Sequence, residues 1–169
     1  MIGFSQDLGL ITIALIVLLL TYAAISDFAT RQIPNLISLL VALIGLTLRF
    51  QANQLTSSLA VAALAFGGLY LLWTRGWIGG GDVKLLAATT LLVPPSQALD
   101  LLLAVSLAGG VLSAVYLLLI RLRLPPMQAG ARTPLRRILR AENWRIRRRG
   151  PLPYACAISA GGLLTLLGG

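Results

Sequence analysis

The sequence predicts an all-α integral membrane protein, a bundle of six transmembrane helices with a short fourth helix and both termini outside. Hydrophobic residues make up 57% of the 169 residues and charged residues only 11%, whereas soluble domains are about 25% charged. Several apolar stretches also reach or approach the ~20 residues that cross a bilayer as a helix. We therefore expect a single membrane domain over residues 1–169.

Six apolar segments predict the spans. In order, they are 8–25, 33–49, 56–73, 83–93, 97–120 and 152–167. The first lacks a basic n-region and is interpreted as a retained span, not a removed signal peptide. Pro34 suits the first turn of the second helix. The fourth, about 11 residues long, covers only about 16 Å, so it crosses a core of about 30 Å only where protein shields it or the membrane is thin.

The basic residues indicate the orientation. Six crossings divide the connections into two sets: 26–32, 74–84 and 121–150 on one side, and both termini with 49–55 and 94–97 on the other. The first side then holds 13 of the 14 basic residues, the exception being Arg49. Cytoplasmic loops carry the excess of Lys and Arg, so the first side is expected to be cytoplasmic.

The connection 121–150 is the one long polar stretch, and it is rich in arginine. Thr133-Pro134 predicts the start of a helix there. Its apolar face would be formed by Leu135, Ile138, Leu139 and Ile146. A basic amphipathic helix of this kind is expected to lie on anionic membrane lipids. Nucleic acid is not an expected partner.

The composition narrows the chemistry. Histidine is absent and Cys156 is the one cysteine, which disfavours Ser-His and Cys-His catalysis and zinc sites. No metal or cofactor is expected. If the protein is an enzyme, its five carboxylates are the leading candidates for proton transfer.

Two of these carboxylates, Asp27 and Asp82, lie at the predicted cytoplasmic edge. Acids near spans are costly and often functional. Two alternatives remain open: Asp82 could cap a helix that begins at Val83, and Asp27 could be a turn residue paired with Arg31. The triplet Gly79-Gly80-Gly81 would give room for an extended peptide beside Asp82, or it is a plain flexible loop.

A facing pair of carboxylates that shares one proton has a known use. The ionised acid takes a proton from water while the protonated acid polarises a carbonyl, and the roles then reverse. This chemistry requires no histidine, cysteine or metal.

Three stretches resemble the prepilin peptidase family, which are membrane aspartic proteases with a GxGD motif. They are Gly79-Gly80-Gly81-Asp82-Val83-Lys84-Leu85, Ser26-Asp27 followed by Arg31-Gln32-Ile33-Pro34-Asn35, and Leu152-Pro153-Tyr154-Ala155-Cys156-Ala157-Ile158 with Gly161. The resemblance implies that Asp27 and Asp82 are catalytic. It also suggests motif or substrate-positioning roles for Gly79, Gly80, Gly81, Lys84, Pro34 and Asn35, although Lys84 could simply be a lysine that snorkels at a helix end.

The resemblance further implies a substrate and a location. The substrates would be type IV (Flp-like) prepilins or pseudopilins, cut at the cytoplasmic face of the bacterial inner membrane. The chain resembles the short, peptidase-only branch, since it lacks the N-terminal region with paired cysteines of the larger members, and N-methylation is not expected. Two alternatives are a non-catalytic component of a pilus or secretion assembly, and a GxGD protease that cuts within spans.

Overall fold

The computed structural model describes the backbone of residues 2–122, 134–148 and 150–168, and the side chains of 8–122, 137–148 and 150–168. All regular secondary structure in these ranges is helical, which confirms the all-α prediction for them. The α-helices are α1 Ile2–Thr30, α2 Asn35–Gln51, α3 Leu55–Thr74, α4 Gly80–Thr90, α5 Ala98–Arg121, α6 Pro134–Arg147 and α7 Tyr154–Gly168. One 3-10 turn, η1 Pro95–Gln97, precedes α5.

An apolar helix overlaps each of the six predicted segments, and two of the boundaries that differ lie beside Asp27 and Asp82. The predicted end of the first span at residue 25 is wrong, because α1 continues through Asp27 to Thr30. Arg31, with φ 58°, then ends it in the left-handed region, the usual conformation just after a helix. The predicted start of the fourth helix at Val83 is also wrong, because α4 begins at Gly80.

In the part of the chain that the structure describes, three helices are long and apolar enough to cross a membrane: Leu8–Thr30, Leu55–Thr74 and Pro95–Arg121. The other apolar helices are shorter, with 17 residues in α2, 11 in α4 and 15 in α7. These helices and their composition indicate a membrane protein. Six crossings with both termini outside remain a prediction.

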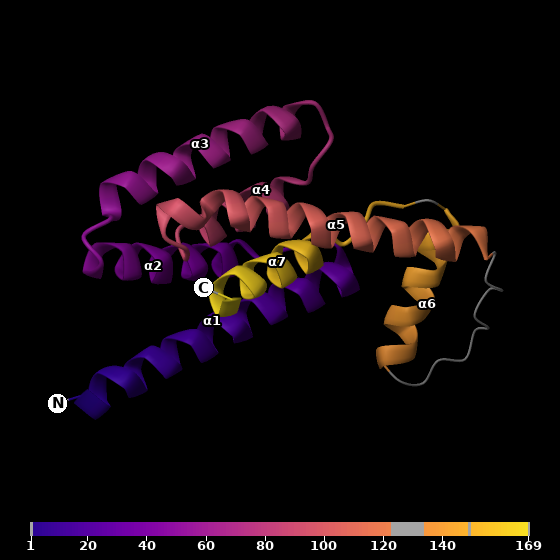
Figure 1. The fold of residues 1–169 in the computed structure, drawn as a ribbon. Coiled ribbons are helices and arrows are strands. Elements are labelled where there is room, and N and C mark those ends of the chain that lie inside the picture. Colours follow the sequence, from indigo (N-terminus) through magenta and orange to yellow (C-terminus); the bar gives the residue numbers. More distant parts are fainter. Residues whose placement is uncertain (1, 123–133, 149, 169) are drawn as a thin grey trace.

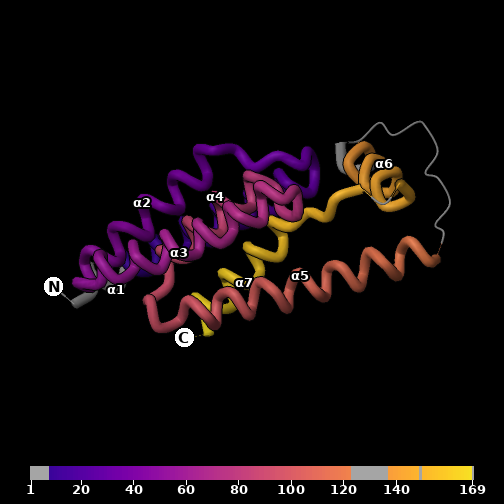
Figure 2. The backbone as a smooth tube through the Cα atoms, turned by 90° about the horizontal axis from the view of Figure 1, so that it is seen from above, coloured from indigo at the N-terminus to yellow at the C-terminus, as the bar shows by residue number. Residues whose placement is uncertain are grey.

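The helices run back and forth between two ends of the bundle (Figures 1 and 2). One end holds both termini and the connections α2–α3 and α4–α5. The other end holds the connections α1–α2 and α3–α4 together with α6 and the start of α7. The connections rich in arginine therefore gather at one end, as the alternation in the sequence predicts.

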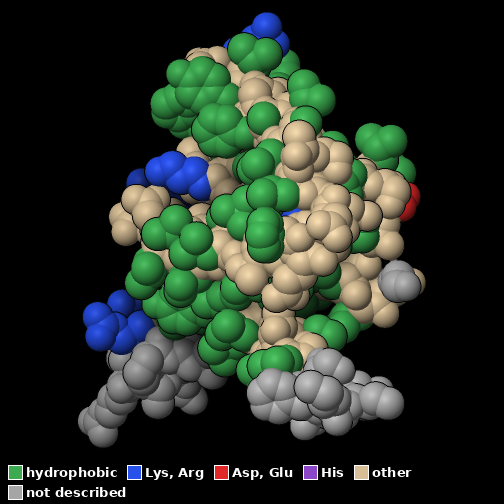
Figure 3. All heavy atoms as spheres, turned by 90° about the vertical axis from the view of Figure 1, so that its left-hand side faces the viewer, with side chains coloured by type: hydrophobic (Ala, Val, Ile, Leu, Met, Phe, Trp, Pro, Cys, Tyr) green, Lys and Arg blue, Asp and Glu red, His purple; other side chains and the backbone are tan. Residues whose placement is uncertain are grey.

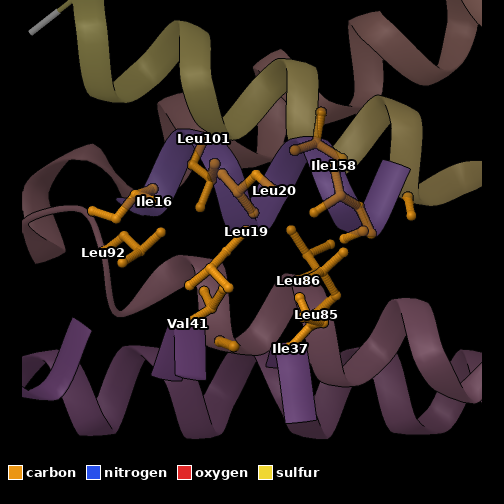
Figure 4. Packing of buried hydrophobic residues seen from close by; sticks show 14 of the residues in the cluster. Ile16, Leu19, Leu20, Ile37, Val41, Leu85, Leu86, Leu92, Leu101 and Ile158 are labelled. Carbon is orange, nitrogen blue, oxygen red and sulfur yellow. The ribbon is translucent and has the colours of Figure 1, made fainter. Parts of the chain in front are cut away.

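The short helix α4 lies inside the bundle, packed against α2, α3 and α7. Its side chains at Val83, Leu85, Leu86 and Ala88 are buried, and Figure 4 shows Leu85 and Leu86 facing side chains from neighbouring helices, among them Ile37 of α2 and Leu20 of α1. Neighbouring helices, not lipid, thus cover α4. This shielding explains how a helix too short for a typical bilayer is accommodated.

The outer surface is apolar, as expected for a protein surrounded by lipid. On the three long helices, Leu10, Leu64 and Leu107 are 66%, 77% and 71% exposed. Figure 3 shows hydrophobic side chains spread over the face at the end with the termini, with charged groups in only a few places. Burying such a surface in water-excluding lipid is favourable, whereas a soluble monomer rarely exposes so much of it.

Candidate active site

Asp27 is buried in the last turn of α1 and bound to the start of α7. Its side chain is only 6% exposed, and Oδ2 accepts a hydrogen bond of 3.0 Å from the backbone N–H of Ala155. Ala155 is the second residue of α7, so its N–H has no acceptor within the helix. The carboxylate satisfies this donor and places its negative charge at the positive end of the helix.

Asp82 lies in the first turn of α4 and interacts with the N-terminus of that helix. It is the third residue of the helix, and Gly79 is the N-cap residue before it. The backbone of Gly79 hydrogen-bonds to the Asp82 carboxylate, as an acid at this position does in a capping box. Asp82 therefore interacts with a helix start, as the capping alternative expects, but it does so from the first turn of a helix that begins at Gly80 and not as the residue before a helix that begins at Val83.

The two carboxylates interact through their charges. The negative charge of Asp27 acts electrostatically on Asp82, and Tyr154, the first residue of α7, is also within electrostatic reach of Asp82. The beginnings of α4 and α7 thus bring the two acids together although they are 55 positions apart in the sequence.

One oxygen of the pair remains available. Oδ1 of Asp82 is buried and accepts no hydrogen bond from the part of the chain that the structure describes. A buried carboxylate oxygen normally has a donor, so this atom can accept a hydrogen bond from a water or a substrate. The pair therefore combines two carboxylates held by helix N-termini with one free acceptor, which suits proton transfer to and from a bound water.

The glycine triplet is closely packed, and this corrects the expectation of free space or a flexible loop. An added Cβ would lie 2.9 Å from Oδ2 of Asp82 at Gly79, 3.2 Å from the Trp73 indole nitrogen at Gly80 and 3.3 Å from Ile33 at Gly81. None of the three has a positive φ. These three positions therefore suit glycine because they leave little room for a side chain, and not because their backbone adopts a conformation that only glycine allows.

Pro34, Asn35 and Lys84 form a second group beside the pair. Pro34 is the N-cap residue of α2, one position before the first turn predicted for it. Lys84 Nζ donates a hydrogen bond of 3.1 Å to Oδ1 of Asn35, which joins α4 to α2. Both residues border a groove of about 790 Å³ between α2, α3 and α4, which is otherwise mainly apolar.

The alternative that pairs Asp27 with Arg31 is wrong. Arg31 forms its ion pair with Glu142 of α6. Glu142, which is 4% exposed, also accepts hydrogen bonds from Tyr116 of α5 and, at 3.1 Å, from Arg145. We refer to Arg31, Tyr116, Glu142 and Arg145 as the Glu142 cluster.

The sequence reasoning missed the Glu142 cluster and the N–H of Ala155. It treated α6 as a helix on the lipid surface with Leu139 and Ile146 on one apolar face; Leu139 is 42% exposed, whereas Ile146 is 9% exposed and faces the protein. The side chain of Leu135 lies outside the described residues. One signal was present: Glu142 stands four positions from both Ile138 and Ile146, so a helix places this acid on the apolar face.

Within the described residues, no group of three or more His, Cys, Asp or Glu side chains that could hold a metal ion comes together. The candidate site consists of Asp27 and Asp82 with the N–H groups that bind them.

Comparison with protein families assigns most of the chain to a known family. The model of the Type IV leader peptidase family matches residues 14–114, a region that includes both aspartates, the glycine triplet and the α2 start. Comparisons with curated proteins and with solved structures give no match.

Proposed function

Because the chain belongs to the Type IV leader peptidase family, we propose that it is an aspartic endopeptidase in which Asp27 and Asp82 activate water. Its substrates are the N-terminal leaders of type IV, Flp-like prepilins or pseudopilins. It cuts them at the cytoplasmic edge of the bacterial inner membrane. The family establishes a peptidase; the aspartic mechanism, the substrate and the orientation are the proposal.

One observation carries the aspartic mechanism. The negative charge of Asp27 acts on Asp82, and each carboxylate is bound by the backbone at the start of a helix, at Ala155 and at Gly79. Carboxylates fixed in this way lose little freedom during the reaction, which favours catalysis.

The reaction follows from a pair that shares one proton. The ionised carboxylate takes a proton from water, and the water oxygen bonds to the peptide carbonyl carbon. The protonated carboxylate gives its proton to the carbonyl oxygen, so a neutral tetrahedral intermediate forms. The intermediate returns its hydroxyl proton to one carboxylate while the other protonates the nitrogen, and the C–N bond breaks to release an acid and an amine.

The proposed cytoplasmic location of the site rests on the distribution of the basic residues and on the arrangement of the helices. Both aspartates lie at the end of the bundle where the α1–α2 and α3–α4 connections and α6 gather (Figure 2). In the sequence, the stretches 26–32, 74–84 and 121–150, which contain these segments, hold 13 of the 14 basic residues, and basic segments remain in the cytoplasm. Exposed arginines of the 121–150 connection, such as Arg137 and Arg147, would contact anionic lipid headgroups.

Cleavage of a co-expressed prepilin tests the proposal. Asp27→Asn and Asp82→Asn should each abolish leader removal, scored as a mobility shift on a gel, because neither amide can exchange the required proton. Asp100→Asn is the matched control: Asp100 is also an acid in a first helical turn, but α5 begins at the opposite end of the bundle. Full processing by either site variant would contradict the two-aspartate mechanism.

A further inference from the structure

The Glu142 cluster is a buried group of charges that the proposed chemistry does not use. It joins three parts of the chain: Arg31 after α1, Tyr116 of α5, and Glu142 with Arg145 of α6. Its side chains are largely covered, with Glu142 5%, Arg31 14% and Arg145 20% exposed. A helix that merely rests on lipid headgroups would have no need for a buried acid on its inner face.

Arg145 binds the end of α1 directly. Its Nη1 donates a hydrogen bond of 3.1 Å to the carbonyl of Phe28, and its Nη2 one of 3.2 Å to that of Ala29. The last carbonyls of a helix have no donor within it, and a basic side chain can supply one. Phe28 and Ala29 directly follow Asp27, so α6 is attached to the same helical turn as the carboxylate.

The chain segment after α6 reaches the other side of Asp27. The N–H of Gly150 bonds to the carbonyl of Arg145 at 2.8 Å, which turns the chain at the end of α6. Pro153 is fully buried, and α7 begins at the next residue with the N–H of Ala155 on Asp27. One stretch of about a dozen residues therefore contacts the Asp27 turn twice, through a guanidinium and through a backbone N–H.

The charges of the cluster also extend to the aspartate. Arg31, Glu142 and Arg145 each act electrostatically on Asp27. A buried ion cluster adds little net stability, because removing its charges from water is costly, but the loss of one partner is severe because it leaves a buried charge unpaired. Such a cluster is better suited to fixing one arrangement of helices than to stabilising the fold.

We propose that α6 positions the active site, with Glu142 and Arg145 as positioning residues that fix the last turn of α1 against the first turn of α7. The inference rests on the proposed function of Asp27, since positioning matters for cleavage only if Asp27 takes part. Hydrogen exchange of the full-length protein in detergent tests the positioning itself without any substrate.

The exchange experiment compares Glu142→Gln and Arg145→Gln with the matched control Arg140→Gln. Arg140 is exposed on the same helix, so its substitution removes an arginine charge without touching α1. Both cluster variants should speed exchange about tenfold or more in peptides that cover residues 27–31 and 154–156, because local opening becomes easier. The control should exchange like the parent protein. Unchanged exchange in both cluster variants would overturn the proposal.

Cleavage kinetics then separate positioning from substrate binding. Glu142→Gln and Arg145→Gln should lower kcat about 10- to 100-fold, as small misplacements of reacting groups do, and leave KM within about twofold. Arg145→Lys should recover part of kcat, because it keeps one charged donor but not the fork that bonds two carbonyls. A raised KM with normal kcat would contradict a positioning role.

The two proposals can fail separately. If the parent protein cleaves no prepilin, the proposed function fails, and the exchange data alone decide whether α6 holds the Asp27 turn. If cleavage occurs and Asp27→Asn abolishes it while the cluster variants exchange and cleave normally, the two-aspartate mechanism stands and the positioning role is refuted.

Discussion

Asp27 and Asp82 each bind a backbone N–H at the start of a helix, although Asp27 itself lies in the last turn of α1. Asp82 binds a backbone N–H of its own helix, at Gly79, whereas Asp27 binds one supplied by α7, at Ala155. The positive ends of two helices therefore face the same pair of acids. Helix N-termini stabilise negative charge, so each of these helices favours the ionised form of the carboxylate that it binds.

A side chain on the residue before α4 would displace the Asp82 carboxylate. An added Cβ at Gly79 would lie 2.9 Å from Oδ2 of Asp82, a distance at which the carboxylate has to move. The glycines beside it are limited by Trp73 and Ile33 in the same way. The motif is thus a packing requirement around one carboxylate.

A single alanine tests this requirement. Gly79→Ala should lower kcat about tenfold or more, because it displaces the Asp82 carboxylate from its N–H donor. Gly68→Ala is the control, since nothing lies within 4 Å of an added Cβ at that exposed position in α3 and alanine favours the helix. Cleavage rates of the two purified variants provide the measurement. Equal, normal rates would show that the carboxylate tolerates the methyl group.

Among the helices, α7 is the one that binds the Asp27 side chain. Besides the bond from Ala155, its Ser159 hydroxyl donates a hydrogen bond of 2.7 Å to the carbonyl of Leu20, and Cys156 Sγ contacts the carbonyl of Ala24 at 3.5 Å. On its other side α7 packs against α5, where Gly161 allows backbone contact. An added Cβ at Gly161 would lie 2.6 Å from the Val105 nitrogen.

Gly161→Ala should therefore push α7 away from α5. Overpacking against backbone costs about 1–3 kcal/mol, so the midpoint of thermal unfolding in detergent should fall by several degrees, and cleavage should weaken as Ala155 shifts from Asp27. Gly168→Ala, near the end of the same helix with nothing within 4 Å, should leave both unchanged. An unaltered midpoint for Gly161→Ala would mean that the α5–α7 contact can relax at no cost.

At the scale of the whole molecule, the arrangement predicts which segments share a side of the membrane. The α2–α3 and α4–α5 connections lie at the end with the termini, and the α3–α4 connection lies at the other end with α6 (Figure 1). If the short α4 crosses the membrane inside its protein shell, its two ends must be reached from opposite sides.

Cysteine labelling in intact cells of a bacterial host measures on which side of the membrane each connection lies. In a Cys156→Ser background, the exposed positions Ala52, Trp77 and Ser96 are changed singly to cysteine. A maleimide that cannot cross the membrane should label Ala52→Cys and Ser96→Cys from outside, and Trp77→Cys only after permeabilisation, because basic connections remain in the cytoplasm. Labelling of Trp77→Cys and Ser96→Cys from the same side would rule out a crossing by α4.

The helical class, the positions of the apolar helices and the two acids of the candidate site could all be predicted from the sequence. These follow from local information: runs of apolar residues, the sign of the charges between them, and short motifs such as the one that ends in Asp82. The sequence could not place the ends of α1 and α4, because helix ends depend on which N–H and C=O groups find partners elsewhere.

The groups that bind the two acids could be identified only from the folded protein. Asp27 and Ala155 are 128 positions apart, and Arg31 and Glu142 are 111 apart, so no local pattern connects them. The folded protein also shows that α6 is attached to α1 and that the glycine triplet is packed. The physical reason is that hydrogen bonds and burial are set by which helices become neighbours, and this depends on the shapes of whole faces and not on the residues next to each acid.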